Sequence, residues 1–479
     1  MKRSLKFTLV IAGVLMLACT AKAANTWYVD DDNYGKEGLT GKTAELACGT
    51  IQDAINKASS GDTIYVAPGV YNQGTGNSAA SYGLSRIGWQ NKKLFIYSTH
   101  GADKTHIVGR KSSESDSGVG ADAMRCVTIY DNDGTLCSGS VIKGFTLRDG
   151  GTVASGTQNT YALRGGAVSV PHGDIYFVDC VISDCSSNNG GAVYKGSYVR
   201  CLFKMNSCHG GGNAVIKGDQ SKKVRLYACV FHHNTWGLEN NNGEGYMFSN
   251  VQAVNCTVID NAVKYCTDSQ DDEFYNTLFF HSGTYGSKSI YKNCMNENDE
   301  VYPVMSTLIP DVRLLSGSKA IGAGDAQYLS LSPFLEEFGY KDFGGNDLAG
   351  KSGAISIGAT QTVGTPVAGG IAVNGGATIV NGGGRCRSNS YSYVFPDAYP
   401  TQYLFSAVAP AGKRLSYFQF TGNPLVAFDS RFPDRKDNLW VMPPANPDIV
   451  ITNSNTFIRD VVYVKPDADA ALADGTVRL

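Results

Sequence analysis

A short sequence pattern recurs in the middle of this chain and limits the folds that the chain can adopt. Each copy has a cysteine with apolar residues two positions before and after it: Cys180, Cys201, Cys229 and Cys256. A second shared position follows five residues later: Cys185, Asn206, Asn234 and Asn261. The copies are 21, 28 and 27 residues apart. Repeats of roughly 20 to 50 residues are typical of chains that stack one structural unit on the next.

The repeat unit favours strands over helices. Apolar and polar residues alternate with period two, glycines are frequent and no apolar stripe has helical spacing, so helical solenoids are excluded. A parallel β-helix remains, an all-β fold in which each unit forms one coil and equivalent residues stack about 4.8 Å apart. Stacked asparagines can hydrogen-bond to one another at a turn, and paired glycines let the chain bend sharply.

The cysteines fit the interior of such a coil. In Val178-Cys180-Ile182 the alternation places all three side chains on the buried face, and we expect the same of the other three copies. Twelve cysteines follow Cys19, and an even number in an exported chain would also suit a disulfide framework. Because free cysteine packs as a small apolar residue, we interpret the repeat cysteines as core residues first and disulfide partners second.

At these residues the chain resembles the right-handed parallel β-helix, or pectin-lyase-like, superfamily. The segment TIQDAINKASSGDTIYVAPGVY (50–71) is similar to that superfamily's amino-terminal capping helix and first coil, with Thr50 as the helix cap. The tetrapeptides FKMN and FHHN, with their GGA motifs, also resemble the repeats of polymorphic outer-membrane adhesins. The resemblance covers roughly residues 25 to 361. It implies a right-handed β-helix but no single activity, because the superfamily includes lyases, hydrolases, adhesins and inert scaffolds.

The two ends of the chain differ from this central part. A basic start, a short apolar stretch and the sequence AKA predict a signal peptide at 1–23, with lipidation of Cys19 as the alternative. We therefore expect an exported bacterial protein, extracellular or at the cell surface, with its β-helix at 24–361. A linker at 362–373 and a small β-sandwich-like module at 374–479 would follow. No later stretch approaches the about 20 apolar residues of a membrane-spanning helix.

Composition and acidic motifs bear on partners and metals. Charged residues are 18% of the chain and the net charge is −2, so nothing indicates nucleic acid as a partner. We expect a monomer. An EF-hand is rejected at Asp30–Gly35, because Tyr34 and Gly41 occupy ligand positions, although a calcium site near the cap stays open. The acidic run at 268–273 is either a solvated loop or a calcium site with Asp271 and Asp272 as ligands.

Stacking of the repeats places one set of polar residues together. Lys204 and His232 would point outward on adjacent coils. Lyases of this fold abstract a proton beside a uronate carboxylate, and Lys204 or His232 is the candidate base. Arg200, Lys195 and His233 are the candidate substrate-binding residues. A glycoside hydrolase is disfavoured, because its two carboxylates would lie about 14 Å apart if Asp184 and Asp260 stack in register.

Two functions follow from different classes of protein. The preferred interpretation is a surface or secreted protein that binds a polysaccharide or a surface glycan, as an adhesin does. The alternative is a polysaccharide lyase, with Lys204 and His232 in the roles described. A flank with rows of aromatic side chains would favour the binding protein, whereas a groove around Lys204 and His232 would favour the enzyme.

Overall fold

The computed structural model describes most of residues 24–361 and the backbone of the strands between 363 and 466. The described ranges with side chains are 24–76, 82–131, 134–154, 161–210, 214–235, 245–259, 261, 263, 265–267, 271–280, 282–283, 286, 288–296, 312–314, 318–348 and 354–361. The predicted signal peptide, with Cys19, lies outside the described residues.

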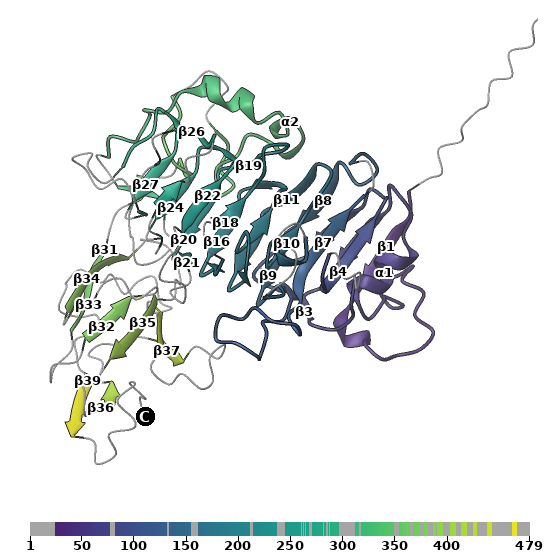
Figure 1. Ribbon diagram of the computed structural model, residues 1–479, viewed down its shortest axis with the longest axis horizontal. Coiled ribbons are helices and arrows are strands. Elements are labelled where there is room, and N and C mark those ends of the chain that lie inside the picture. Colours follow the sequence, from purple (N-terminus) through teal and green to yellow (C-terminus); the bar gives the residue numbers. More distant parts are fainter. Residues whose placement is uncertain are drawn as a thin grey trace, which may run out of the picture.

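Three long parallel sheets run side by side along the molecule (Figure 1). The first, sheet A, contains β1 (Thr26–Val29), β2 (Thr63–Val66), β5 (Phe95–Ser98), β8 (Ser140–Lys143), β11 (Ile175–Val178), β15 (Ser197–Val199), β19 (Val224–Tyr227), β23 (Val251–Val254), β26 (Glu273–Tyr275) and β28 (Ile290–Lys292).

The other two sheets are also parallel, and each receives one strand from successive coils. Sheet B contains β3 (Gly69–Tyr71), β6 (Thr105–Val108), β9 (Thr146–Arg148), β12 (Val181–Ser183), β16 (Leu202–Lys204), β20 (Val230–His232), β24 (Thr257–Ile259) and β27 (Leu278–Phe280). Sheet C contains β4 (Ser85–Gln90), β7 (Arg125–Tyr130), β10 (Val168–Ser169), β14 (Val193–Tyr194), β18 (Ala214–Lys217), β22 (Tyr246–Ser249) and β25 (Tyr265–Thr267).

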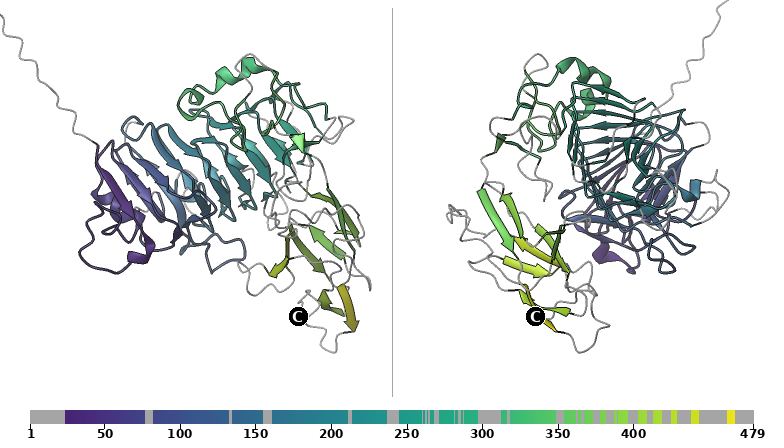
Figure 2. Two further views of the ribbon diagram at one scale, coloured as in Figure 1. Left: turned by 180° about the vertical axis from the view of Figure 1, so that it is seen from behind. Right: turned by 60° about the vertical axis from the view of Figure 1, so that its left-hand side comes forward.

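Each coil visits the sheets in the same order, as the right-handed parallel β-helix predicted from the repeats requires. A short fourth sheet lies between sheets B and C and contains β13 (Ser186–Ser187), β17 (Ser207–Cys208) and β21 (Thr235–Trp236). One continuous cluster of buried side chains, from Trp27 to Phe279, fills the space between the sheets. Figure 2 shows the stack of coils from two further directions. The predicted fold is confirmed.

The capping helix is also confirmed. Helix α1 (Ile51–Lys57) lies at the amino-terminal end of the stack, where Thr50 Oγ1 accepts a hydrogen bond from the Asp53 amide at 3.0 Å. Its apolar side chains Ile51, Ala54 and Ile55 are buried against the first coils. The helix thereby covers apolar interior that the end of the stack would otherwise expose to water.

The cysteines stack inside the coils, but one part of the predicted alternation is wrong. Cys180 and Ile182 are core residues, whereas Val178 lies on the opposite, outer side of sheet A with its counterparts Val199, Tyr227 and Val254. The cause is Asp179, whose φ of 53° turns the chain between sheets A and B and breaks the period of two. Cys180 therefore sits at a corner rather than at the centre of a strand.

The stacked thiols confirm the interpretation of the cysteines as core residues. The cysteines within the described ranges are free. Cys201 Sγ donates to the Phe177 carbonyl and Cys229 Sγ to the Tyr198 carbonyl, at 3.3 and 3.4 Å. Burial raises the pKa of Cys201 and Cys229 well above the ordinary range, so both thiols stay protonated at neutral pH.

The predicted asparagine stack forms inside the coils. Asn206 Nδ2 donates to Asn234 Oδ1, and Asn234 Nδ2 donates to Asn261 Oδ1, both at 2.9 Å. Each side chain also accepts from the backbone amide of the coil before it: Asn234 Oδ1 from Asn206, and Asn261 Oδ1 from Asn234. Since all three asparagines are fully buried, this column satisfies polar groups that water cannot reach.

Residues 312–315, 318–348 and 354–361, called the strap, fold back along the later coils. The strap contains β29 (Leu314–Leu315), the 3-10 helix η3 (Ala326–Leu331) and α2 (Leu335–Phe338). Phe334 and Phe338 pack on Tyr176 of sheet A, and Leu335 is fully buried there. Figure 1 shows α2 above the edge of sheet A. An outer pair of asparagines fastens the strap: Asn255 Nδ2 donates to Ser356 O, and Asn276 Nδ2 to Asp325 O.

Strands also follow residue 361. They are β30 (Val363–Gly364), β31 (Val367–Ala372), β32 (Thr378–Asn381), β33 (Arg387–Ser388), β34 (Ser390–Phe395), β35 (Tyr403–Val408), β36 (Lys413–Phe418), β37 (Leu425–Phe428), β38 (Asn438–Met442) and β39 (Val462–Pro466). Strand β30 pairs with β29 and β31 pairs with β34, so the segment predicted as a linker contains two strands. Pairing from β31 onward is antiparallel, as predicted, whereas the sandwich and the domain boundaries stay predictions. None of the described helices is long and apolar enough to span a membrane.

Candidate functional site

A row of tyrosines lies on the outer face of sheet A, on the first three coils. Tyr28, Tyr65 and Tyr97 are register partners in β1, β2 and β5, and we call them the tyrosine ladder. The apolar neighbours of these tyrosines in each strand fill the core, so strand alternation turns the tyrosines outward. Their ring centroids are 6.2 and 6.0 Å apart, and the rings are tilted by 31° and 41°.

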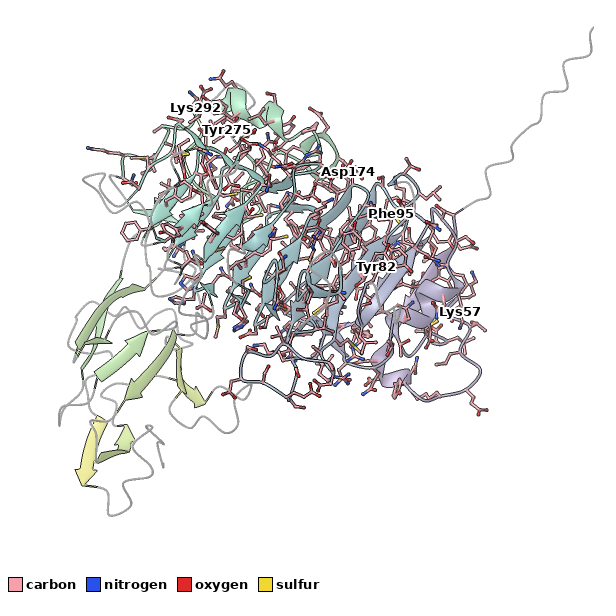
Figure 3. The ribbon with its side chains drawn as sticks, viewed as in Figure 1. Lys57, Tyr82, Phe95, Asp174, Tyr275 and Lys292 are labelled. Atoms are coloured by element: carbon pink, nitrogen blue, oxygen red, sulfur yellow. The ribbon has the colours of Figure 1, made fainter. Side chains whose placement is uncertain are left out.

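The strap leaves this part of sheet A accessible. From Tyr176 to Tyr275 the outer face of the sheet carries strap side chains, with Tyr328 packed on Tyr275 at 4.9 Å. The ladder begins where that cover ends: Tyr97 borders the strap, and Tyr65 is 38% exposed. Lys93 lies over the neighbouring Phe95, whose place on this edge is labelled in Figure 3. The ladder thus presents one aromatic ring per coil, and the middle ring, Tyr65, is the most exposed of the three.

A second aromatic group covers the outer face of sheet C. Tyr82 stacks on Tyr130 with ring centroids 4.0 Å apart, and on Tyr161 at 5.5 Å. Tyr194 lies 6.1 Å from Tyr161. We call these four residues the tyrosine platform; Figure 3 labels Tyr82. Arg164 extends the platform, because its guanidinium lies 4.6 Å from the Tyr194 ring and donates to the Tyr194 hydroxyl at 2.6 Å.

Arg125, at the start of β7, holds the platform in place from below. Its side chain is almost fully buried and donates to carbonyl oxygens of the two segments that carry the rings. The acceptors are Tyr82, Tyr161, Ala162, Arg164 and Gly165. Burial lowers the pKa of Arg125 to about 10, which still leaves the guanidinium charged at neutral pH. Because five carbonyls converge on one cation, the positions of Tyr82 and Arg164 depend on it.

Lys195, a predicted substrate-binding residue, lies beside this platform and not beside Lys204. Its Nζ is 2.8 Å from Asp219 Oδ2 and donates to the Pro171 carbonyl at 3.1 Å. The same carboxylate oxygen accepts from the Tyr194 hydroxyl at 2.7 Å. Burial raises the pKa of Asp219, but hydrogen bonds from Lys195, Ser221 and Tyr194 outweigh it and lower the pKa to about 2. Lys195 therefore belongs to a partly buried ion pair.

Arg200, another predicted substrate-binding residue, lies under the strap. It is buried at the corner between sheets A and B, where φ is 52°. Its Nε is 2.6 Å from Asp179 Oδ1, and its Nη1 donates to the Phe338 carbonyl at 3.3 Å. These contacts give Arg200 a structural position, in which it ties the corner of the coil to the strap.

Lys204 and His232 are neighbours, as the stacking predicted. They are register partners in β16 and β20, and the ring of His233 lies 3.8 Å from that of His232. His232 and His233 are both buried, and Lys204 is half-buried. Next to His232, Val230 packs with strap residues Val312 and Ala359. The strap thus covers sheet B next to the candidate base, and the catalytic roles of Lys204 and His232 stay predictions.

The predicted calcium ligands Asp271 and Asp272 lie in different surroundings. Asp272 is buried and its Oδ1 accepts from the Val251 amide at 2.9 Å, whereas Asp271 is exposed. Among the described residues, one acidic group, Asp30–Asp32, brings its carboxylates within 4.8 Å of one another.

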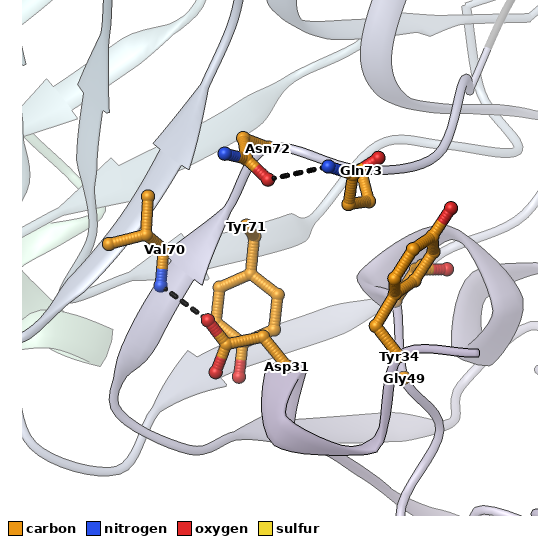
Figure 4. Close-up of a pocket in the computed structure, with 8 residues that line it drawn as sticks. Asp31, Tyr34, Gly49, Val70, Tyr71, Asn72 and Gln73 are labelled. Carbon is orange, nitrogen blue, oxygen red and sulfur yellow. Dashed lines mark hydrogen bonds between the residues drawn. The ribbon is translucent and has the colours of Figure 1, made fainter. Parts of the chain in front are cut away.

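That acidic group borders a pocket of about 220 Å³ beside the capping helix (Figure 4). Asp31 Oδ2 accepts from the Val70 amide at 2.7 Å, and Asp30 caps the short 3-10 helix η1 (Asp31–Asn33). Burial, and then the charges of Asp31 and Asp30, raise the pKa of Tyr71. The carboxylate of Asp30 thus caps a local turn, whereas that of Asp31 joins this turn to β3.

Comparisons with known proteins give low similarity. No family model matches the chain, and no curated protein matches it in sequence. Among solved structures, pectate lyase Pel9A matches at 15% identity over 71% of this chain and 97% of its own, with a TM-score of 0.39. Pectin methylesterase PemA from Erwinia chrysanthemi matches at 12% identity over 59% and 92%, with a TM-score of 0.32. A rhamnogalacturonan lyase matches at 14% identity over 59% and 76%, with a TM-score of 0.31. The fold assignment rests on the three parallel sheets themselves.

Proposed function

We propose that this chain is a glycan-binding protein of the bacterial surface or its surroundings, and that the tyrosine ladder contacts the glycan. The observation that carries this proposal is the regular placement of Tyr28, Tyr65 and Tyr97, one outward-facing ring on each of three successive coils, with Tyr65 exposed and the other two rings half-buried. A repeating spacing of contacts suits a repeating polymer. Export through residues 1–23 and a monomeric state belong to the same proposal.

The chemistry of tyrosine fits a sugar ring. A pyranose has C–H groups on its faces and hydroxyls at its rim, and a tyrosine has an apolar ring and a polar hydroxyl. Contact with the ring removes apolar area from water while the hydroxyls remain able to hydrogen-bond. A partly exposed aromatic row on the outer face of a sheet is also the kind of surface patch that marks an interaction site.

Tyr65, the central residue of the ladder, is the position to test. We expect Tyr65→Ala to weaken binding to a soluble polysaccharide about tenfold, equivalent to about 1.4 kcal/mol. Tyr65→Phe should retain most binding, because the ring remains. Tyr34→Ala is the matched control, since Tyr34 is 56% exposed but lies outside the ladder. Affinity electrophoresis in gels containing hydroxyethyl cellulose or carboxymethyl cellulose measures this. Equal retardation of wild type and Tyr65→Ala would refute the ladder as the binding surface.

A polysaccharide lyase is the second candidate function, favoured by the register pairing of Lys204 with His232. Its test is an assay for unsaturated products on pectate, alginate, hyaluronan and chondroitin, with calcium added. If product forms and either Lys204→Ala or His232→Ala abolishes it in a folded protein, the enzyme replaces the glycan-binding protein as the better description. The buried position of His232 is the observation that ranks this candidate second.

A further inference from the structure

In the described part of the chain, the tyrosine platform on sheet C has a cationic group without a carboxylate partner. Among these residues the Arg164 guanidinium makes one hydrogen bond, to the Tyr194 hydroxyl, and it lies over the rings of Tyr161 and Tyr194. Its Nε is buried and has no hydrogen-bond partner among the described residues. Among the ion pairs within the described ranges, none includes Arg164. A guanidinium has five N–H donors and can form two parallel hydrogen bonds with a carboxylate. The Arg164 guanidinium therefore retains donors for a ligand.

The surrounding charges favour an anion. Three cations have contacts with the platform residues: Arg125 below it, Arg164 within it and Lys195 at its edge. One carboxylate, that of Asp219, has such a contact in the described part of the chain, and it is paired with Lys195. The local balance is therefore positive although the whole chain carries −2. A positive local field attracts an anionic ligand and repels a cationic one.

The position of the Arg164 side chain is also set before a ligand binds. Arg125 holds the backbone of the segment that carries Tyr161 and Arg164, so the guanidinium is preorganised before a ligand arrives. Arg164 itself is only partly buried. The stacked rings of Tyr82 and Tyr161 lie next to it and offer apolar surface to the remainder of the ligand. A preorganised site loses less entropy on binding than a mobile side chain would.

We propose that the tyrosine platform is a second saccharide site, in which Arg164 binds the carboxylate of an acidic sugar. The proposal rests on the proposed function in taking a saccharide as the ligand, but it uses a different sheet and different residues. The tyrosine ladder would contact any pyranose chain, whereas the platform selects chains that carry a negative charge. Two contact sites on one rigid helix also raise the avidity for a long polymer.

Two polymers with the same glucan backbone separate the two sites. Carboxymethyl cellulose carries carboxylates and hydroxyethyl cellulose does not. We expect Arg164→Gln to weaken binding to carboxymethyl cellulose about tenfold and to leave hydroxyethyl cellulose unchanged. Tyr65→Ala should weaken binding to both. Arg225→Gln is the matched control, because Arg225 is a partly exposed arginine on sheet A. The difference between the polymers should shrink as salt is added.

The outcomes distinguish the two proposals. If wild type and Arg164→Gln bind carboxymethyl cellulose equally, the acidic-sugar site is wrong while the ladder still stands. If neither polymer binds, the proposed function loses its support, and glucuronate is tested directly by saturation-transfer NMR. Transfer to glucuronate in wild type but not in Arg164→Gln supports the platform site, and its absence in both overturns it. Should Arg164→Gln not fold, Arg164→Lys keeps the charge without the planar fork and should show an intermediate loss.

Discussion

Replacing Arg125 by methionine tests how the sheet C platform is held. The side chain of methionine replaces the aliphatic part of arginine but has no donors, so five carbonyl oxygens lose the guanidinium. A hydrogen bond to a charged group contributes about 1.5–3 kcal/mol, which gives a gross loss of about 7–15 kcal/mol. Several of these carbonyls lie near the surface, where water can replace part of that loss.

Removing a buried cation also has a benefit. Burial lowers the pKa of Arg125 from its ordinary value to about 10, which corresponds to a cost of about 3 kcal/mol for the charged form. An apolar side chain in this position avoids that cost, and buried ion sites can tolerate such replacement. Taking rehydration of the carbonyls into account, we expect Arg125→Met to destabilise the segment 161–166 by about 2–4 kcal/mol.

Native-state hydrogen exchange measures this local change. A loss of about 2–4 kcal/mol makes the amides of 161–166 exchange roughly 30- to 1000-fold faster, while amides of distant coils keep their rates. Arg125→Lys should fall between, because an ammonium cannot serve five acceptors in one plane. Arg225→Met is the control for loss of a partly exposed arginine. If 161–166 exchanges at the wild-type rate in Arg125→Met, packing alone holds the platform and the reasoning fails.

Three other changes probe the coil itself. Asn234→Leu should cost about 3–5 kcal/mol in urea unfolding, because the buried Asn206 amide and Phe203 carbonyl of the preceding coil lose this side-chain partner. Replacing the exposed Asn72 by alanine should cost less than about 0.5 kcal/mol. The pKa of Asp219 is lowered in the folded protein, so its pairing with Lys195 should stabilise the fold above about pH 4 and be lost as pH falls toward 2. We expect the free energy of unfolding to fall by about 1 kcal/mol over this range, and Asp219→Asn should abolish that pH dependence. Cys229→Ala should cost about 1 kcal/mol in the same assay, with no change in wild-type stability on adding reductant, because the thiol packs without a disulfide.

The fold was predictable from sequence because successive coils place the same residue types at equivalent buried positions. The spacing of Asn206, Asn234 and Asn261 follows from one residue position per coil, and the buried hydrogen bonds between them confirm it. The error at Val178 has a local cause. A residue in the left-handed conformation, such as Asp179, adds a corner without changing the apolar pattern of the sequence. The sequence therefore keeps a period of two at a point where the backbone turns.

The candidate sites were much less predictable. Tyr28, Tyr65 and Tyr97 are 37 and 32 residues apart, outside the spacing of the cysteine repeats, so only the strand register brings them together. Arg164 and Tyr82 come from loops whose path the strand pattern does not specify. The burial of His232 could not be inferred from the repeats either. The strap residues that cover the neighbouring Val230 come from about 80 to 130 residues later in the chain.

The outer asparagines give the molecule an order of assembly. Coils contact their immediate neighbours, so each can form as soon as the preceding one is present, and the stack can grow by short loop closures. The strap is different, because the bond from Asn255 to Ser356 joins residues 101 positions apart. Closing so long a loop is slow, and we expect the strap to dock last, after the coils beneath it exist. Contacts made after the folding transition state slow unfolding without speeding folding, so the strap would act as a kinetic latch on the later coils.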